Sequence, residues 1–191
     1  MNPPGKQIAI LVENLYQVLE VWYPLLRLKE EGIAVQMIGS GSNDSYGSKE
    51  GYPAKVDAAI DDVDTEDLDG VIIPGGFAPD FMRRYPKMIE FVKKMDNDGK
   101  IVASICHGGW MLVSAGILKG RRVTSFFAIK DDLVAAGANY VDEEVAVDKN
   151  LITSRKPEDL PAFVVAIIKQ LKELELKTKQ LTTDMKLKQD K

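Results

Sequence analysis

Four short apolar runs, separated by stretches of helical periodicity, constrain the fold of this 191-residue chain more than any other feature. We predict strands at QIAILV (7–12), IAVQMIG (33–39), DGVIIPGG (69–76) and IVASI (101–105). An amphipathic pattern over 18–31 and a charged one over 86–98 predict helices between them. Because strands that alternate with helices form parallel sheets covered on both faces, the pattern predicts an α/β fold with a mostly parallel sheet.

The rest of the chain continues the alternation, and residues 1–172 are predicted to form a single domain without internal repeats. A loop rich in Gly, Ser and Asp (39–47) leads into a β-like segment over 52–60. Helices are predicted over 107–118 and 129–137, and short strands at YVDEEVAVD and NLITS. Pro157 stands where a proline can begin the last helix.

Residues 173–191 form a tail rich in Lys and Glu, with two interpretations open. An apolar stripe with alternating steps of four and three residues enters this tail and predicts a helix. Its members are Ile167, Leu171, Leu174, Thr178, Leu181 and Met185. The tail is then either a helix extension that packs on another subunit or a frayed, solvated terminus.

Composition excludes several classes of function. Hydrophobic residues make up 45% and charged residues 28% of a chain with a formal net charge of −4, which argues against binding to nucleic acid or to an anionic membrane. No apolar run reaches the ~18 residues that cross a bilayer, and no signal-peptide pattern opens the sequence. One cysteine forms no internal disulfide, and one cysteine with one histidine supplies no transition-metal ligand set. We therefore expect a cytoplasmic protein with no metal and no cofactor.

The only cysteine and the only histidine, Cys106 and His107, are adjacent and follow the strand predicted over 101–105. Ligands of parallel α/β sheets bind at the carboxyl ends of strands. Ser104 and Gly108 flank Cys106 at the spacing of a nucleophile elbow, in which a sharp strand-to-helix turn exposes the central side chain. The helix N-terminus favours thiolate there, and His107 can accept the thiol proton or, as imidazolium, stabilise the anion. The alternative is a buried cysteine packed as a small hydrophobic residue.

The Pro-Gly-Gly segment at 74–76 ends the neighbouring predicted strand. Backbone amides without side-chain cover can approach a reaction intermediate closely, so we expect the N–H groups of Gly76 and His107 to form an oxyanion hole. Pro-Gly-Gly is also a common tight turn without any catalytic role.

Two carboxyl groups can complete such a site. Glu20 begins the helix after the first predicted strand and, when protonated, can donate a hydrogen bond to a thiolate. Asp80 follows the glycine turn and can orient His107 as a third triad member. Acidic residues are numerous in this chain, so each is alternatively a solvated or helix-capping residue.

Several segments together resemble the ThiJ/PfpI superfamily, and within it the PfpI-type intracellular proteases of the class I glutamine amidotransferase-like branch. These segments are YPLLRLKEEG (23–32), LDGVIIPGGFAPD (68–80), GKIVASICHG (99–108), the TS and IKDDLVAAGA block (124–138) and SRKPEDLPAF (154–163). They extend to residue 172 and leave the Lys-rich tail outside. ASICHG combined with PGGFAPD is a specific signature.

The resemblance implies a flavodoxin-like three-layer sandwich and a homo-oligomer, either a dimer or a hexamer, with the site near a subunit interface. It implies Cys106 as the nucleophile with His107 beside it. Glu20, four residues before Pro24, falls where the family has a carboxylic acid hydrogen-bonded to that cysteine. Asp80 falls where the PfpI branch has an acid that pairs with the histidine across a subunit interface.

The chain departs from the family pattern at four places. Asp80 stands where this branch usually has Glu, and Gly109 with Trp110 stands where Pro often follows His-Gly. Phe126 replaces a frequent tyrosine, and Gln17 replaces a frequent acid in the first loop. These changes affect the geometry of the triad and the shape of the pocket, and they leave the nucleophile in place.

The leading functional hypothesis is a cofactor-free cysteine hydrolase or lyase of the PfpI type. The resemblance implies a peptidase, or a glyoxalase-like or deglycase-like enzyme, acting on a peptide or on a small carbonyl compound such as a 2-oxoaldehyde adduct. The alternative is a stress-responsive redox sensor or chaperone that uses an oxidisable Cys106. A scaffold that keeps the fold without turnover is the third hypothesis.

Overall fold

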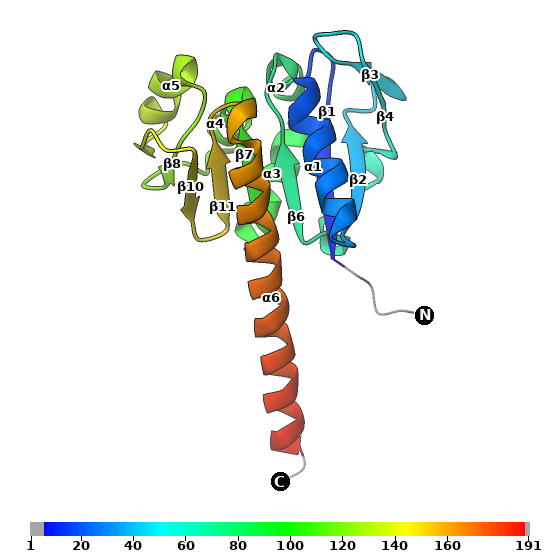
Figure 1. Cartoon of the computed structure of the whole chain (residues 1–191), viewed down its shortest axis with the longest axis vertical. Coiled ribbons are helices and arrows are strands. Elements are labelled where there is room, and N and C mark those ends of the chain that lie inside the picture. Colours follow the sequence, from blue (N-terminus) through cyan, green and yellow to red (C-terminus); the bar gives the residue numbers. More distant parts are fainter. Residues whose placement is uncertain (1–5, 190–191) are drawn as a thin grey trace.

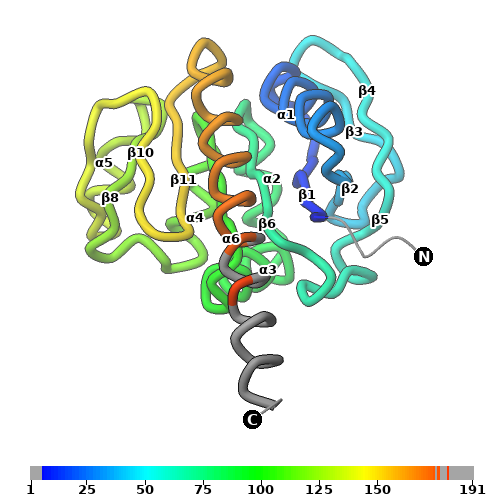
Figure 2. The backbone as a smooth tube through the Cα atoms, turned by 60° about the horizontal axis from the view of Figure 1, so that its bottom comes forward, coloured from blue at the N-terminus to red at the C-terminus, as the bar shows by residue number. Residues whose placement is uncertain are grey.

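A seven-stranded sheet forms the centre of the molecule, and every neighbouring pair of strands is parallel except the pair at one edge, β10 with β11 (Figure 1). The structure is a computed structural model that describes residues 6–189, without the side chains of residues 175, 177–179 and 181–189. From edge to edge the strands are β10 (Val145–Asp148), β11 (Leu151–Ser154), β7 (Ile101–Ile105), β6 (Gly70–Ile73), β1 (Gln7–Val12), β2 (Ala34–Gly39) and β5 (Ala58–Ala59). Figure 2 shows β10 and β5 on opposite sides of the molecule.

Helices cover both faces of this sheet and produce three layers. On one face α1 (Val18–Glu30) packs beside α6 (Leu160–Gln189). On the other face α3 (Pro86–Asn97) packs beside α4 (Gly109–Ala115), with α2 (Ala78–Met82) and α5 (Lys130–Ala135) against α4. The predicted α/β sandwich with a mostly parallel sheet is therefore confirmed.

Continuous burial explains why the central strands are apolar at almost every position. Five of the six β1 residues and all five β7 residues are buried. A strand covered by helices on both faces has no solvent-facing side, so the period-two alternation of an exposed sheet is absent. The strands predicted at 7–12 and 101–105 have these same bounds in the structure.

Local signals set the ends of the two helices that frame the site. The Gln17 side chain caps α1 by accepting a hydrogen bond from the Glu20 backbone N–H, at 3.1 Å. After α1, Gly32 adopts a φ of +75° and turns the chain toward β2. Gly116, with a φ of +70°, ends α4 in the same left-handed conformation.

Five short elements differ from the sequence prediction or add to it. The predicted loop over 39–47 contains β3 (Ser45–Gly47), which pairs antiparallel with β4 (Pro53–Lys55). Helix α2 was not predicted, because five residues carry too little periodicity to detect. A two-stranded parallel unit, β8 (Arg122–Val123) with β9 (Asn139–Tyr140), flanks the sheet edge.

The C-terminal helix α6 continues past the end of the sheet, away from the edge where the strands finish (Figure 1). Ile167 and Leu171 are buried and Leu174 is half-buried, while Lys172 pairs with Glu31 of α1 at 2.9 Å. The backbone is helical through Gln189. The predicted contacts of Thr178, Leu181 and Met185 fall on side chains outside the described residues.

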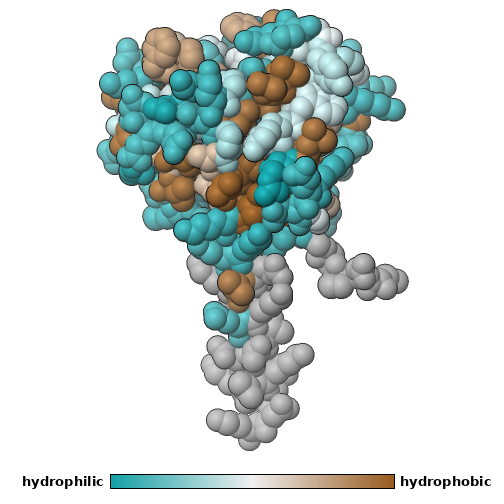
Figure 3. Space-filling model, in the orientation of Figure 1, coloured by the Kyte–Doolittle hydropathy of each residue, from teal (hydrophilic) through white to brown (hydrophobic). Residues whose placement is uncertain are grey.

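On the face shown in Figure 3, several apolar areas lie among polar side chains. Leu19 and Leu26 on α1 and Val165 on α6 are more than half exposed on the helical face. Among residues 6–189, no helix is long and apolar enough to cross a membrane.

Candidate active site

Three neighbouring strands, β7, β6 and β1, end at the same edge of the sheet and bring the predicted site residues together. Cys106 follows β7, Gly75 and Gly76 follow β6, and Glu20 lies in the first turn of α1 after β1. After β1 the chain moves outward to β2 and then returns to β6 on the other side. Ligand sites of open α/β sheets form at such a reversal of strand order.

Cys106 occupies a strained turn between β7 and α4. Its φ is +60°, in a region that side chains other than glycine rarely adopt, and it begins the 3-10 turn Cys106–Gly108. A Cβ atom at Gly108 would lie 2.5 Å from the Ile73 carbonyl oxygen and 2.7 Å from the Ser104 hydroxyl oxygen. The packing of this turn therefore leaves no room for a side chain at Gly108. The helix predicted from residue 107 begins, as an α-helix, at Gly109.

Gly75 lets the β6 turn approach the cysteine closely. A Cβ atom there would lie 2.7 Å from both the Cys106 Cβ and the His107 backbone nitrogen, and 2.9 Å from Glu20 Oε2. Gly76 has a φ of +74°, and its added Cβ would overlap the Leu15 carbonyl. No other residue fits either position without displacing the turn.

Backbone amides of two turns converge on the cysteine sulfur. The N–H groups of Gly76 and His107 donate hydrogen bonds to the Cys106 side chain and lower the pKa of its thiol. These two amides are the pair predicted to form an oxyanion hole. Both amides point at Sγ. When Sγ bonds to the carbonyl carbon of a substrate, the carbonyl oxygen would therefore lie near these two donors.

Glu20 is fully buried and its carboxyl group lies between the glycine turn and the cysteine. Oε2 accepts a hydrogen bond from the Gly75 N–H at 2.6 Å. Oε1 has no oxygen or nitrogen partner among the described residues, and the Glu20 carboxyl interacts with the Cys106 thiol. Burial raises the pKa of Glu20 from 4.5 to about 7, against the opposing effects of Gly75 and Cys106. A large share of Glu20 is therefore protonated near neutral pH; when Glu20 is ionised, its carboxylate accepts a hydrogen bond from the Cys106 thiol, which lowers the pKa of Glu20 and raises that of the thiol.

The surroundings of Cys106 favour its thiol form, which opposes the thiolate that the helix terminus favours. Cys106 is 7% exposed, and burial together with the charge of ionised Glu20 raises the pKa of its thiol to about 12. The following α4 has only seven residues. Desolvation and a like charge thus outweigh the helix terminus and the two amide donors.

His107 is a proton acceptor that lies beside the sulfur. Its Nδ1 lies 3.3 Å from Cys106 Sγ, its ring stacks on Phe126 with centroids 4.9 Å apart, and Trp110 meets it edge-on at 5.2 Å. Burial, and then the charge of Lys49, lower the pKa of His107 below its usual 6.5. The imidazole is therefore neutral at pH 7, which supports the role of proton acceptor over that of stabilising imidazolium.

Asp80 does not reach His107 within one chain. Its carboxylate pairs with Arg84 one turn later on the same segment. Among the described residues, no hydrogen bond joins Asp80 to His107. The contact between these residues across a subunit interface stays a prediction.

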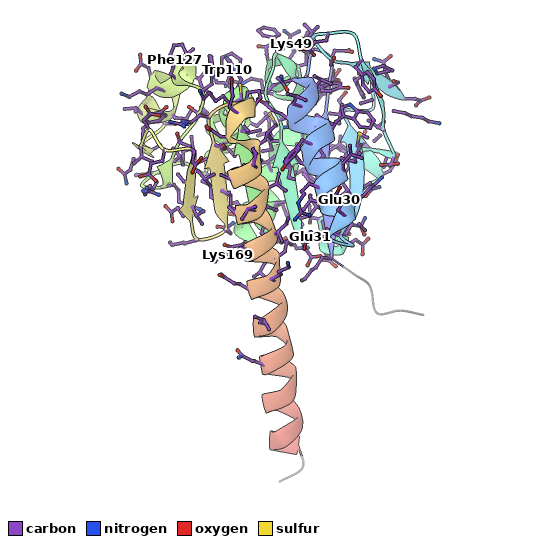
Figure 4. All side chains as sticks on the ribbon, in the orientation of Figure 1. Glu30, Glu31, Lys49, Trp110, Phe127 and Lys169 are labelled. Atoms are coloured by element: carbon purple, nitrogen blue, oxygen red, sulfur yellow. The ribbon has the colours of Figure 1, made fainter. Side chains whose placement is uncertain are left out.

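Aromatic rings surround His107 and extend to the surface. Phe77 meets Trp110 at 6.5 Å, and Phe126 meets Phe127 at 4.6 Å. Phe77 is 45% exposed and Phe127 is 76% exposed. Figure 4 shows Trp110 and Phe127 at the same end of the molecule as Lys49. These aromatic rings, with Phe126 where a tyrosine is frequent, form an apolar surface next to the cysteine.

The sequence does not identify two residues of the site, Lys49 and Gly75. Lys49 follows β3 and lowers by its charge the pKa of both Glu20 and His107. Nothing in the local sequence distinguishes it from other lysines, since its place depends on a loop folding back to the sheet edge. Gly75 lies in the same Pro-Gly-Gly segment as Gly76, the glycine that the pattern indicates as an oxyanion donor. Within residues 6–189, no group of three or more His, Cys, Asp or Glu side chains is arranged to hold a metal ion.

Comparison with known proteins places the chain in a family of this architecture. The profile of the DJ-1/PfpI family matches residues 6–170, and the chain belongs to that family. It is 43% identical over 166 residues to the Pyrococcus furiosus protein named deglycase PfpI, covering 87% of this chain and 99% of that protein. The Bacillus subtilis protein YraA, named provisionally as a cysteine protease, is 41% identical over 159 residues, covering 83% of this chain and 94% of YraA.

A solved structure agrees with these sequence relatives. A two-domain protein of Anabaena variabilis with DJ-1/ThiJ/PfpI-like and ferritin-like domains superimposes with a TM-score of 0.85 at 41% identity. The match covers 87% of this chain and 50% of that protein. Both the resemblance to the ThiJ/PfpI superfamily and the expected flavodoxin-like sandwich are confirmed.

Proposed function

We propose that the protein is a cysteine-dependent hydrolase or deglycase of the PfpI type, acting on a peptide or on a small carbonyl compound and its adducts. The observation that carries the proposal is the contact of Cys106 Sγ with His107 Nδ1 at 3.3 Å beside two inward-facing amides. The deglycase name of one relative and the protease name of another support the same nucleophile chemistry.

The first step is common to both substrate classes. Cys106 Sγ attacks the carbonyl carbon, an S–C bond forms, and the electron pair of the carbonyl moves to its oxygen. The thiol proton passes to His107 Nδ1, so the neutral ring must carry its other proton on Nε2. Because the resting group is a thiol, the proton leaves as the new bond forms.

The amides of Gly76 and His107 then stabilise the oxyanion. They are preorganised by the two turns and require no rearrangement during the step, which makes their contribution large in a site shielded from water. His107 returns its proton to the oxyanion in an addition, or to the amine leaving group in an acyl transfer.

Glu20 controls the charge beside the sulfur. Ionised Glu20 repels a thiolate, whereas a protonated carboxyl group can donate a hydrogen bond to one. With a pKa of about 7, Glu20 takes up or releases its proton in the range where the enzyme would act. It is therefore a second proton-carrying group of the reaction.

A cytoplasmic location and a homo-oligomer belong to the same proposal. The exposed apolar residues Leu19, Leu26 and Val165 on the helical face support association with a second copy. If Asp80 pairs with a partner's histidine, assembly must first draw it away from Arg84.

Conversion of methylglyoxal to lactate without glutathione, and release of lysine from its methylglyoxal adduct, test the proposal. Turnover is expected for the wild-type protein and for Ser45→Ala, an exposed control on β3. Cys106→Ser and Cys106→Ala are expected to lose it. Full turnover by Cys106→Ala would exclude the mechanism.

The redox-sensor alternative has less support. A buried thiol with a raised pKa is not the exposed thiolate that peroxide oxidises readily. Mass spectrometry after mild peroxide is expected to show unmodified Cys106, and rapid sulfinic acid formation would reverse the preference between the two functions.

A further inference from the structure

Lys49 stands in the turn between β3 and β4, on a backbone segment that is linked to the glycine turn of the site. The Lys49 N–H donates a hydrogen bond to the Tyr16 carbonyl oxygen at 3.0 Å. Tyr16 forms a parallel bridge with Ser48 on one side and an antiparallel bridge with Gly76 on the other. Three backbone segments therefore lie side by side. Since neighbouring β-paired chains are about 5 Å apart, the Lys49 backbone lies about 10 Å from that of Gly76.

The Lys49 side chain is exposed, and its ammonium group forms no ion pair with any side chain that the structure describes. Its charge nevertheless lowers the pKa of both Glu20 and His107, the two groups that flank the Cys106 sulfur. The charge of Glu158, just before α6, acts on Glu20 in the opposite sense and less strongly. The ammonium therefore acts on the reacting groups from the mouth of the site while its three N–H donors remain available to a ligand.

A neutral carbonyl compound has no group that uses this cation. The amides of Gly76 and His107 face the carbonyl oxygen, and the rings of Phe126 and Trp110 border the imidazole. The four-carbon stem of Lys49 covers part of the distance from its backbone to the site, and a substrate of a few carbon atoms covers the rest. The residues around Cys106 thus suit a substrate with an electrophilic carbonyl at one end and a negative charge at the other.

We propose that Lys49 is a specificity-determining residue, which binds a carboxylate located a few carbon atoms from the carbonyl carbon that Cys106 attacks. This inference rests on the proposed function and narrows its substrate class to small carbonyl compounds with an anionic end. The pair is exposed to solvent and salt, so its effect is modest. We expect a preference of about three- to ten-fold in kcat/KM at low ionic strength, which decreases as salt is added.

The probe for this preference is 4,5-dioxopentanoate, a 2-oxoaldehyde with a terminal carboxylate. Its conversion follows the same course as that of methylglyoxal to lactate. The aldehyde carbon is oxidised to a carboxylate, the adjacent ketone carbon is reduced to a secondary alcohol, and one water molecule is consumed. The product is 2-hydroxyglutarate, and the reaction needs no external oxidant or reductant.

Kinetics with this probe and its neutral methyl ester test the inference. The wild-type protein is expected to prefer the acid, Lys49→Gln to abolish the preference and Lys49→Arg to retain it. Lys55→Gln, at an exposed lysine on β4, is the control and keeps the wild-type ratio. Because both compounds meet the same Glu20 and His107, their ratio cancels the effect of Lys49 on those pKa values. Equal ratios in the wild-type protein and Lys49→Gln overturn the inference.

Protection of Cys106 from iodoacetamide measures binding without turnover. The ketone 4-oxopentanoate has the carboxylate but no aldehyde, and it is expected to protect Cys106 at a lower concentration than its methyl ester does. This difference is expected to disappear in Lys49→Gln. Equal protection by the two compounds, or protection by neither, overturns the inference even when methylglyoxal is turned over. Preferential protection without turnover of any 2-oxoaldehyde would instead contradict the proposed function and leave the carboxylate site standing.

Discussion

Glu20 and Cys106, brought together from the first turn of α1 and the turn after β7, affect each other's ionisation in opposite directions: the charge of ionised Glu20 raises the pKa of the thiol, and the hydrogen bond from Cys106 lowers the pKa of Glu20. Both side chains are buried, and the ionised carboxylate raises the pKa of the thiol. The site therefore holds at most one of the two negative charges easily, and the proton that neutralises the other is available for transfer.

We predict that Glu20→Gln lowers the pKa of the Cys106 thiol. The amide has the shape of the carboxyl group but no charge, so the repulsion of a thiolate disappears. The rate of Cys106 alkylation by iodoacetamide against pH measures the effect, and no other cysteine contributes to the signal. A thiol pKa that rises in Glu20→Gln would show that the protonated carboxyl group mainly stabilises the thiolate.

Stability should depend on pH through the same residue. The folded state raises the pKa of Glu20 from 4.5 to about 7, so it binds this proton more tightly than the unfolded state does. Wild-type stability relative to Glu20→Gln therefore falls as pH rises from about 4.5 to about 7 and stays constant above that range, by about 3 kcal/mol in total. Urea unfolding at pH 4, 6 and 8 measures the difference, and parallel curves for the two proteins would refute it.

Lys49 should control the protonation of His107. Its charge lowers the pKa of the imidazole, so Lys49→Gln is expected to raise that pKa, while Lys55→Gln on β4 leaves it unchanged. His107 is the only histidine, so NMR titration of a tag-free protein gives a single imidazole signal. Identical titrations in the wild-type protein and Lys49→Gln would place Lys49 outside the site.

The glycine turn can be tested by adding one carbon atom. Gly75→Ala drives a methyl group against Cys106, His107 and Glu20, so we expect a loss of about 1–3 kcal/mol in stability and a drop of about 100-fold in kcat/KM. Gly47→Ala is the matched control, because nothing lies within 4 Å of its added Cβ. Equal activity of the two variants would mean that the turn is free to move.

The sequence predicts the central architecture because strands buried on both faces appear in the sequence as continuous apolar runs. Strands 7–12 and 101–105 are continuous apolar runs, and Gly32 marks the end of α1. The hairpin of β3 and β4 has no comparable apolar run in the sequence. Its short strands are stabilised by contacts with the loop after β1, such as the bond from the Leu15 N–H to the Gly47 carbonyl oxygen at 2.7 Å.

The candidate site is predictable where residues follow a strand end and not where a loop folds back. Cys106 and Gly76 follow directly from motifs at the carboxyl ends of β7 and β6. The pairing of Asp80 with Arg84 depends on α2, which has too few residues to predict. The thiol state of Cys106 depends on three-dimensional burial, which outweighs the helix terminus that sequence alone indicates.

The positive φ of Cys106 suits a glycine, whereas the proposed reaction requires a cysteine at this position. Glycine is the one residue that adopts this conformation freely, so Cys106→Gly would relieve backbone strain of about 1–3 kcal/mol. A chain selected for stability alone would carry glycine at this position. The cysteine therefore lowers the stability of the fold and in return holds a sulfur atom in a fixed direction.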